Sequence, residues 1–355
     1  MRSVAESASE TICVSIERLV DDAVARQFVM WPELERSFSA TQRTRMREDT
    51  RYHLEFFASA LWFSEPAILD DYAVWCKTLF ANLNLPSEWI EGSWLRIAET
   101  LDAALPSEEA AATRTAIEDA IVTLKAASTA SSSFLAPGAP LGELARNYLI
   151  TILDGDRADA VRLVIDAANS GVSARDIYLR IFQPTQREMG RLWLLNEVSV
   201  AEEHYVTAVT QVAMARLHER SALPATTGMT LVAASVGSEL HDLGIHMVAD
   251  VFELDGWNTR YLGANTPRSA VLEAVRATRS DVLALSATIA SHVTEVAEII
   301  DDLRADESTA HVKVLVGGYP FNVAPDLWRR VGADGYAADA ETAPQIAARL
   351  AAQSA

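Results

Sequence analysis

From residue 229 onward, short apolar runs alternate with helical segments, and this alternation restricts the fold more than any other feature of the chain. The run Met229–Val236, MTLVAASV, is apolar apart from Thr230 and Ser235, as expected for a strand buried on both faces of a parallel sheet. The alternation continues with predicted strands near Tyr261, from Asp281, from Val312 and near Tyr336, and with predicted helices at Pro267–Arg279 and Val293–Arg304. Residues 228–355 are therefore predicted to form a flavodoxin-like, doubly wound parallel sheet.

The rest of the chain has helical patterning. An all-helical N-terminal domain is predicted over residues 1–127, because no convincing run of alternating strand residues interrupts it. The small, polar and Pro/Gly-containing stretch Ala126–Gly142, AASTASSSFLAPGAPLG, predicts a linker, which is assigned to residues 128–142. Helices return over residues 143–222, where Pro184 is predicted to bend or divide the segment Ala174–Leu194. The fold class expected for the chain is α + α/β.

Composition excludes several classes of function. A net charge of -19 opposes nonspecific binding to nucleic acid, which requires a surplus of Lys and Arg, and opposes binding to an anionic membrane surface. Cys13 and Cys76 are too few for a disulfide framework. No apolar stretch approaches the length of a membrane span, and no signal peptide is evident. A soluble, cytoplasmic protein is expected.

Polar and glycine residues gather where the predicted strands end, which is where doubly wound sheets bind ligands. They fall after three of the strands: Glu239, His241, Asp242 and Gly244 after the first, Ser286 and Thr288 at the end of the third, and Gly317 and Gly318 after the fourth. The spacing Glu-x-His-x-x-Gly is common by chance, and alone it would leave His241 an ordinary loop histidine. Its order on successive strand ends makes these residues a candidate ligand site.

This set resembles the fingerprint of cobalamin-binding domains, which more often have Asp at the first position. The resemblance implies that His241 displaces the benzimidazole of the cofactor and becomes the lower axial ligand of cobalt. Glu239 would then hold the other ring nitrogen, and Gly244 would let the following helix approach the nucleotide tail. It also implies that Ser286 or Thr288 hydrogen-bonds the buried base and that the glycine pair offers backbone without a Cβ.

A second motif precedes the sheet. Trp193 is followed after nine residues by Glu203-His204, which is similar to the cap of CarH-type photoreceptors that hold adenosylcobalamin in the dark. The resemblance implies a four-helix bundle over residues 143–222, with these three side chains around the adenosyl group. Those photoreceptors have a histidine directly after the tryptophan, whereas this chain has Leu194, so the upper cobalt ligand after light stays open. Without the neighbouring fingerprint, Trp193 would be a core residue and Glu203-His204 a solvated pair.

The N-terminal domain departs from the photoreceptor repressors, which begin with a basic helix-turn-helix. Here it is acidic and rich in aromatic residues, so direct DNA binding is not expected. An ordinary helical core and a slot for a flat aromatic ligand both fit this composition. Arg43, Arg47 and Arg51 share one helical face, which either pairs with the propionates of a tetrapyrrole or is a solvated face balanced by Glu48 and Asp49.

The whole layout resembles the photocobilins, which combine cobalamin with the bilin biliverdin. That resemblance makes one set of residues candidates for bilin contact: Arg43, Arg47, Arg51, Tyr52, His53, Trp62, Trp75 and Cys76, with covalent attachment to Cys76 left open. The function it implies is a light sensor, not an enzyme, that acts as a homodimer or through a separate signalling partner. The alternatives are a corrinoid methyl carrier of a methyltransferase system, which Trp193 disfavours because methyl transfer needs an open upper face, and a cobalamin sensor or carrier without photochemistry.

Overall fold

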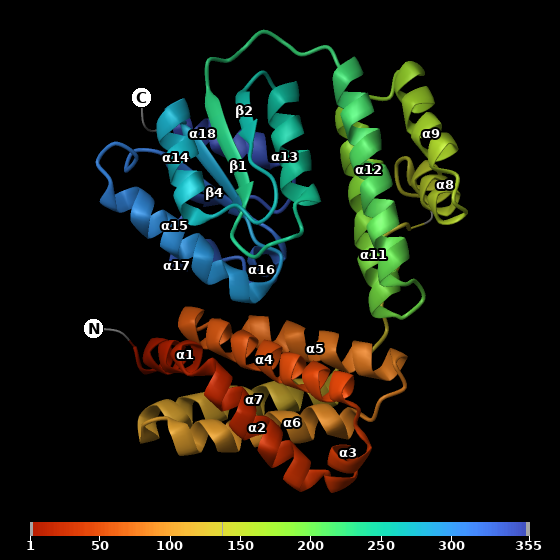
Figure 1. Cartoon of the computed structure of the whole chain (residues 1–355). Helices are drawn as coiled ribbons and strands as arrows, with labels where there is room; N and C mark the ends of the chain where they lie inside the picture. The colour runs from red at the N-terminus through yellow and green to blue at the C-terminus, as the bar shows by residue number, and fades with distance from the viewer. Residues whose placement is uncertain (1–2, 137, 353–355) are drawn as a thin grey trace. The chain divides into compact units, whose positions relative to one another are not determined.

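A computed structural model describes residues 3–136 and 138–352 of the chain, shown in Figure 1. The chain divides into two compact units, Met1–Ala130 and Ser131–Ala355. The first unit is helical, and the second combines a helical bundle with a parallel sheet. The predicted fold class, helices followed by a doubly wound α/β sheet, is confirmed.

Helices build the whole of the first unit within its described residues. Ser3 and Ser39 begin two of them with capping boxes, in which the serine hydroxyl and a side chain three residues later satisfy each other's backbone N–H groups. Pro32 and Pro66 stand in the first turns of two others, where the missing N–H has no cost. The bounds are α1 Val4–Val14, α2 Ile16–Met30, α3 Pro32–Ser37, α4 Ala40–Phe63, α5 Pro66–Asn82, α6 Ser87–Ala104 and α7 Ser107–Ala126.

Aromatic rings from α4, α5 and α6 form part of the core of this unit. Tyr72 stacks on Phe56 at a centroid distance of 3.8 Å and on Trp94 at 6.0 Å. The Tyr72 hydroxyl lies 2.8 Å from Nδ1 of His53, a buried histidine that also meets the edge of Trp94. Burial lowers the pKa of His53 from 6.5 to about 4. The rings therefore pack on one another, as an ordinary helical core would.

Acid should destabilise the first unit through His53. The unfolded histidine takes up a proton near pH 6.5, whereas the folded one stays neutral until about pH 4. Stability from the buried neutral ring is therefore complete above pH 6.5 and declines as the pH falls through this window. Between pH 7.5 and pH 5 the free energy of unfolding should fall by about 2 kcal/mol more in the wild type than in His53→Asn, which does not titrate. Urea unfolding at both pH values measures this difference, and equal falls would contradict the assignment.

The helical bundle of the second unit contains a local irregularity at Pro184. The predicted helix from Ala174 divides into α10 (Ala174–Ile177), the π-helical turn η1 (Tyr178–Phe182) and α11 (Gln183–Leu194). Proline lacks an N–H and crowds the carbonyl four residues earlier, so the wider π-helical turn relieves both problems. The other bundle helices are α8 Gly142–Leu153, α9 Arg157–Asn169 and α12 Val200–Arg220.

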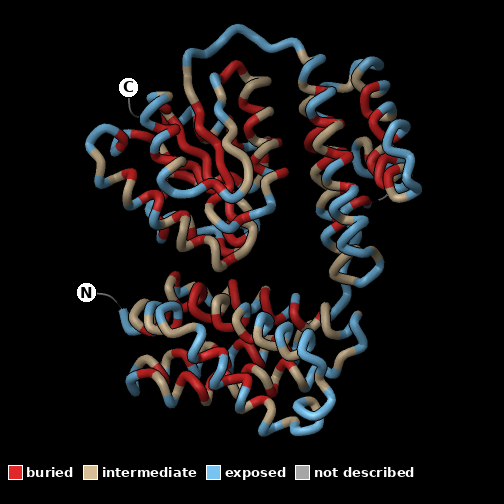
Figure 2. Tube along the Cα trace, in the orientation of Figure 1, coloured by how far each residue is buried: buried red, intermediate tan, exposed pale blue. Residues whose placement is uncertain are grey.

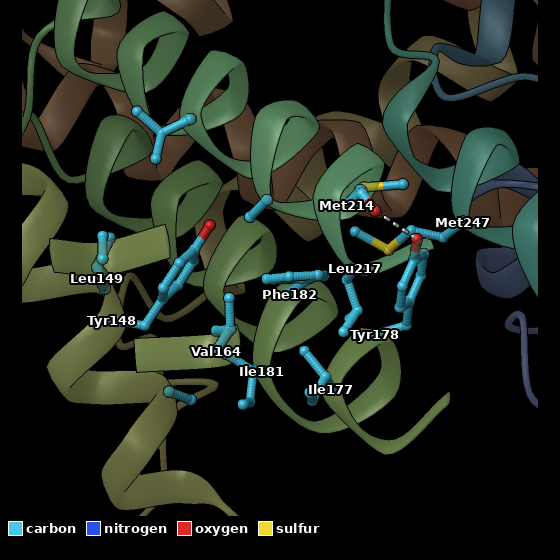
Figure 3. Packing of buried hydrophobic residues seen from close by; sticks show 14 of the residues in the cluster. Tyr148, Leu149, Val164, Ile177, Tyr178, Ile181, Phe182, Met214, Leu217 and Met247 are labelled. Carbon is cyan, nitrogen blue, oxygen red and sulfur yellow. Dashed lines mark hydrogen bonds between the residues drawn. The ribbon is translucent and has the colours of Figure 1, made fainter. Parts of the chain in front are cut away.

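The bundle has an apolar core that continues onto the sheet domain. Figure 3 shows Tyr178 and Phe182 of η1 inside it, with Met214 of α12 and Met247 of α13 beside Tyr178. Leu243 and Val251, also on α13, belong to the same cluster. Because helix α13 contributes to this cluster, the bundle and the sheet domain share a packed boundary.

The sheet has five parallel strands in the order β2-β1-β3-β4-β5. The strands are β1 Thr230–Ser235, β2 Asn258–Tyr261, β3 Val282–Ser286, β4 Lys313–Gly317 and β5 Gly335–Tyr336. Each falls within or beside a predicted strand. Helices α13 (Leu243–Leu254) and α18 (Ala343–Ala352) contribute to one apolar layer against the sheet. The remaining elements are α14 Arg268–Thr278, η2 Ala290–His292, α15 Val293–Ala305, α16 Tyr319–Val323 and α17 Leu327–Arg330.

The central strands β1 and β3 are buried almost from end to end, as Figure 2 shows for this part of the chain. Their continuous burial explains why the sequence there is apolar without alternation. The order of strands reverses between β1 and β3, so the carboxyl ends of these two strands flank the switch point of the sheet. Among the described residues, no helix combines the length and apolarity that a membrane crossing needs.

Candidate functional site

The loop after β1 is held by the neighbouring loop after β2. The Ser238 N–H donates to the Asn265 side chain at 2.8 Å, and the Asn265 N–H donates to the Glu239 carbonyl at 2.8 Å. The Ser235 hydroxyl donates to the carbonyl of His241 at 3.2 Å. These bonds fix the backbone on both sides of Glu239, so its side chain is aimed by the fold.

Glu239 and His241 form a tight pair in this loop. One carboxylate oxygen of Glu239 lies 2.5 Å from Nδ1 of the His241 ring and also accepts the His241 backbone N–H at 3.0 Å. The Glu239 side chain is 0% exposed, whereas that of His241 is 60% exposed. A buried carboxylate thus holds one ring nitrogen while the ring itself reaches the surface. This is the geometry that a ligating imidazole needs.

The second carboxylate oxygen of Glu239 faces the loop after β3. It accepts the backbone N–H groups of Thr288 at 2.7 Å and Ile289 at 3.1 Å, and lies 3.1 Å from Nδ1 of His292. Sequence reasoning expected a role for the side chain of Thr288, but here its backbone makes the contact. It missed His292, although a polar residue six positions after Ser286, beyond the same strand end, was a usable signal.

The charges of this cluster reinforce one another. Burial would raise the pKa of Glu239, but hydrogen bonds from His241, His292 and the Thr288 backbone outweigh it and hold the pKa far below its usual range. The hydrogen bond to Glu239 raises the pKa of His241, burial opposes the rise, and the charges of Glu239, Glu203 and Asp242 add to it. Glu239 is therefore ionised and accepts the Nδ1 proton of His241.

Asp242 has a local structural partner. Its carboxylate accepts the Tyr261 hydroxyl at 2.6 Å, and the pKa of Tyr261 is raised by burial and by this bond. His246, which sequence reasoning treated as an ordinary helix residue, stacks on the Tyr261 ring at 4.5 Å. Asp242 lies at the start of α13 beside the His241 loop, and its bond to Tyr261 braces that helix against β2.

The ends of β3 and β4 meet closely at Gly318. Its φ is 106°, in the left-handed region, and an added Cβ would lie 1.9 Å from the Ala287 carbonyl oxygen. At Gly317 an added Cβ would lie 3.1 Å from the Ala337 carbonyl oxygen. Ser286 ends β3 and is buried. The predicted glycine pair therefore also has a role in the fold, because Gly318 permits the close approach of two backbone segments.

Gly244 differs from that pair, because no heavy atom of the surrounding protein would lie within 4 Å of an added Cβ. Protein packing thus gives no reason for a glycine in the first turn of α13, where alanine has the higher helix propensity. Open space at this position fits the prediction that a ligand approaches the helix here.

Gly244→Ala should therefore separate folding from ligand binding. The free energy of unfolding should stay equal or rise by up to about 1 kcal/mol, because alanine favours the helix. Affinity for cobalamin should fall about 10-fold if the nucleotide tail packs against this position. Urea unfolding and a spectral titration with hydroxocobalamin measure the two effects on the same preparation. Unchanged affinity would remove Gly244 from the site.

The predicted cap residues lie at the end of α11 and the start of α12. Trp193 is partly buried near the end of α11. Glu203 lies 2.6 Å from Nδ1 of His204, whose side chain is 74% exposed. The negative charge of Glu203 contributes to the raised pKa of His241, so these two residues interact electrostatically. The start of α12, which carries Glu203, is therefore coupled electrostatically to the His241 loop.

Polar contacts join the bundle to the sheet domain. The Tyr178 hydroxyl donates to Asp250 of α13 at 2.6 Å, and burial raises the pKa of Tyr178. Arg180 of the same π-helical turn pairs with Glu341 at 3.1 Å. The Tyr178–Asp250 bond ties η1 to α13, the helix that begins directly after the His241 loop.

The three arginines that were candidates for bilin contact have partners within the first unit. Arg47 pairs with Asp21 and Glu17, and Arg51 pairs with Glu17 through both guanidinium nitrogens. The ion pairs of this face are made with acids of α2, and the charges of Glu55 and Glu48 add to that of Glu17 in raising the pKa of Arg51. Arg43 donates to the Phe38 and Glu35 carbonyls and lies over the Phe28 ring.

The other bilin candidates differ in exposure. His53 and Cys76 are buried, and burial raises the pKa of the Cys76 thiol, which makes it a poor nucleophile. Tyr52 and Trp75 are exposed, and Trp62 is partly exposed. His53 thus belongs to the core around Tyr72 and Trp94, whereas the arginines contact residues of α2 and α3, so these candidates have separate surroundings within the unit.

The residues around β1 and β3 fit a cobalamin whose lower ligand is a protein histidine. His241 offers an imidazole nitrogen on an exposed ring, Glu239 holds the ring from below, and Gly244 leaves room at the first turn of α13. Cobalt accepts imidazole nitrogen as an axial ligand. Among the described residues, no group of three or more His, Cys, Asp or Glu side chains could hold a metal ion.

Comparison with known proteins agrees with this fit. Residues 229–345 match the B12 binding domain family, and residues 144–218 match a second family with the same description, B12 binding domain. The HTH-type transcriptional repressor CarA of Myxococcus xanthus is 27% identical over 179 residues, which are 50% of this chain and 59% of CarA. The chain therefore spans little more than half of that relative.

Corrinoid proteins are similar over the same region. Trimethylamine corrinoid protein 1 of Methanosarcina mazei is 24% identical over 191 residues, covering 52% of this chain and 86% of that protein. The solved structure of the Methanosarcina barkeri monomethylamine corrinoid protein superposes with a TM-score of 0.52 at 21% identity, over 59% of this chain and 100% of that one, and so shares the fold. The chain thus contains two segments, in order, that each match a B12 binding domain family.

Proposed function

We propose that this protein is a light sensor that binds adenosylcobalamin, with His241 as the lower axial ligand of cobalt. The observation that carries the proposal is the 2.5 Å contact between the buried Glu239 carboxylate and Nδ1 of the exposed His241 ring. Such a partner fixes the tautomer and the orientation of a ligating imidazole. Trp193, Glu203 and His204 are the residues proposed to surround the upper face.

The bundle that carries Trp193 and His204 also packs against α13, the helix that begins directly after the His241 loop. Bound adenosylcobalamin supplies a cobalt–carbon bond that visible light breaks. Trp193 and His204 would contact the adenosyl group in the dark and lose that contact after light. Because the bundle packs on α13 through Tyr178 and Asp250, a change at the cap would bias the packing at this boundary. Light can shift the equilibrium only by as much as the two states differ in these contacts.

We propose that the protein is a homodimer and transmits the signal by a change in its assembly, or that it acts on a separate signalling partner. We propose no enzymatic reaction and no direct nucleic-acid contact. The net charge of -19 supports the second point, because it repels phosphates.

The second candidate is a corrinoid methyl carrier. Its support is the similarity to proteins named as methylamine corrinoid proteins. A carrier would bind methylcobalamin and pass the methyl group to a partner enzyme through an open upper face. Trp193, partly buried near the end of α11, supports the light sensor instead, because a bulky ring there would obstruct an open upper face.

The two candidates differ in their response to green light. Full-length protein is loaded in the dark with adenosylcobalamin, and its visible spectrum and elution volume are measured before and after illumination. The light sensor predicts a converted corrin band together with a changed elution volume, and Trp193→Ala should weaken the dark complex. Retained corrin with an unchanged elution volume would favour the carrier, and transfer of a methyl group from bound methylcobalamin to a thiol acceptor would support it directly.

We further propose that the N-terminal unit binds biliverdin. Its support is the aromatic composition of residues 1–127 and the resemblance to the photocobilins, whereas the ion pairs of Arg47 and Arg51 with α2 weigh against a role in binding propionates. Biliverdin added to the same preparation tests it. A long-wavelength band that co-elutes with the protein would support the bilin, and its absence would make this unit a helical module for assembly.

A further inference from the structure

A row of hydrogen-bonded polar side chains runs through the helical bundle and ends at Glu203. The Tyr148 hydroxyl of α8 donates to the Thr210 hydroxyl of α12 at 3.1 Å, and the Gln186 amide of α11 bonds the same hydroxyl at 2.9 Å. The Thr207 hydroxyl lies 3.0 Å from the Gln186 amide oxygen and 3.1 Å from one carboxylate oxygen of Glu203. Three helices of the bundle thus contribute to one continuous row.

The inner end of this row is fixed in the bundle core. Tyr148 and Thr210 are 0% exposed, and Tyr148 belongs to the apolar cluster of Figure 3. Burial raises the pKa of Tyr148, so its hydroxyl keeps its proton and remains a donor. Buried polar groups are costly unless they are hydrogen-bonded, whereas apolar side chains would fill the same space without that requirement. Packing alone therefore gives no reason for a polar row at this place.

Helical spacing brings the row to the proposed cap residues. Glu203, Thr207 and Thr210 follow one another at intervals of four and three residues on α12, so they share one face of that helix. Gln186 and Trp193 are seven residues apart on α11 and share a face in the same way. The face of α12 that carries Glu203 is therefore bonded, through Gln186, to the face of α11 that carries Trp193.

The Glu203 carboxylate is held at both of its oxygens. One oxygen lies 2.6 Å from Nδ1 of His204, and the other faces the Thr207 hydroxyl. That hydroxyl has a single proton and two acceptors within reach, Glu203 and Gln186. A ligand that donates to the Glu203 oxygen would leave the Thr207 proton with Gln186 as its acceptor, so no buried group would lose its partner. The row thus orients the carboxylate and lets it accept a new donor at little cost.

We propose that Thr207 is a positioning residue that aims the Glu203 carboxylate at a hydrogen-bond donor of the upper cobalt ligand, and thereby favours adenosylcobalamin over cobalamins with a small upper group. This inference rests on the proposed function, in which Glu203 lies at the upper face. The ribose hydroxyls and the adenine amino group are such donors, whereas a methyl group offers none. Loss of one well-placed hydrogen bond weakens binding by about 5- to 10-fold, and methylcobalamin should not show this loss.

Spectral titrations of the full chain in the dark with adenosylcobalamin and with methylcobalamin measure this preference as the ratio of the two dissociation constants. Thr207→Val removes the hydroxyl and keeps the shape, so the preference should fall about 5- to 10-fold while methylcobalamin affinity stays within about 2-fold of the wild type. Thr207→Ser keeps the hydroxyl and should keep the preference. In a Glu203→Ala background, Thr207→Val should change the preference by less than about 2-fold, because Thr207 acts through Glu203.

Thr151→Val is the matched control, because the Thr151 hydroxyl of α8 donates to the Asn147 carbonyl of its own helix. It should leave the preference unchanged. An unchanged preference in Thr207→Val would overturn the inference, and so would equal losses in Thr207→Val and Thr207→Ser, or a full further loss in the Glu203→Ala background. A wild type that binds adenosylcobalamin no more tightly than methylcobalamin would instead overturn the proposed function on which the inference rests.

Discussion

Glu239→Ala should lose both stability and cobalamin affinity. The substitution removes a fully buried carboxylate that accepts from two backbone N–H groups after β3 and from the backbone and ring of His241. Each buried donor left without a partner costs about 1–3 kcal/mol, so the free energy of unfolding should fall by about 3–5 kcal/mol. Without its partner the His241 ring loses a fixed orientation, and affinity for hydroxocobalamin should fall 10- to 100-fold.

Two further variants make this prediction specific. Glu298→Ala removes an exposed glutamate of α15 that pairs with Arg268, and it should change stability by less than about 0.5 kcal/mol with no effect on binding. Glu239→Asp keeps the charge but shortens the side chain, so it should not reach both loops and should fall between Glu239→Ala and the wild type. Urea unfolding and spectral titration measure both quantities. A stable Glu239→Ala variant with full affinity would show that the loop holds His241 without the carboxylate.

Gly318→Ala should have the second large effect, on folding. A Cβ at this position would lie 1.9 Å from the Ala287 carbonyl oxygen, and the φ of 106° is strained for any residue with a side chain. Relief requires that the β3 and β4 ends move apart, which separates Ala287 and Thr288 from their places beside Glu239. The expected loss is at least about 3 kcal/mol in the free energy of unfolding.

Gly317→Ala is the control for this clash. Its added Cβ would meet the Ala337 carbonyl oxygen at 3.1 Å, which a shift of a few tenths of an ångström relieves. The loss should be about 1 kcal/mol. If the two alanine variants unfold at the same urea concentration, the close approach at Gly318 does not govern the packing of these strand ends.

The sheet could be predicted from the sequence because parallel strands that are buried on both faces appear as continuous apolar runs. Residues 231–234 and 282–285 are continuous apolar runs, so the positions of both strands could be predicted. The order of parallel strands then placed Glu239 and His241 at the ligand-binding edge. The contact between them was expected from the resemblance to cobalamin-binding domains, in which a carboxylate holds the second nitrogen of the ligating histidine.

Contacts between distant segments could not be predicted in the same way. His292 meets Glu239 across 53 residues of sequence, and only the reach of a glutamate side chain between two loops makes the contact. Arg47 and Arg51 pair with acids of α2, about thirty residues earlier, because α2 and α4 pack together. Helical spacing showed that the arginines share a face but not which element covers it.

The predicted linker also makes contacts with distant segments that its composition did not reveal. Composition marked residues 128–142 as a connection, yet Leu135 is buried in the bundle core and the Phe134 N–H donates to Glu188 of α11 at 2.8 Å. Glu188 is itself buried beside Arg191, so this anchor is well defined. A single apolar residue within a Ser- and Ala-rich stretch carries too little pattern to reveal such an anchor. The bond from Phe134 to Glu188 fixes one end of the connection to α11, the helix that carries Trp193.

The most direct test of the central claim is electron paramagnetic resonance of the protein with bound cob(II)alamin, prepared with ordinary histidine and with ¹⁵N-labelled histidine. An axial ¹⁴N ligand splits each cobalt line into a triplet, and an axial ¹⁵N ligand splits it into a doublet. The account predicts that labelled histidine converts triplets to doublets in the wild type, and that His241→Ala abolishes the conversion. Triplets that persist in the labelled wild type would mean that the cofactor keeps its own base, and His241 would not be the cobalt ligand.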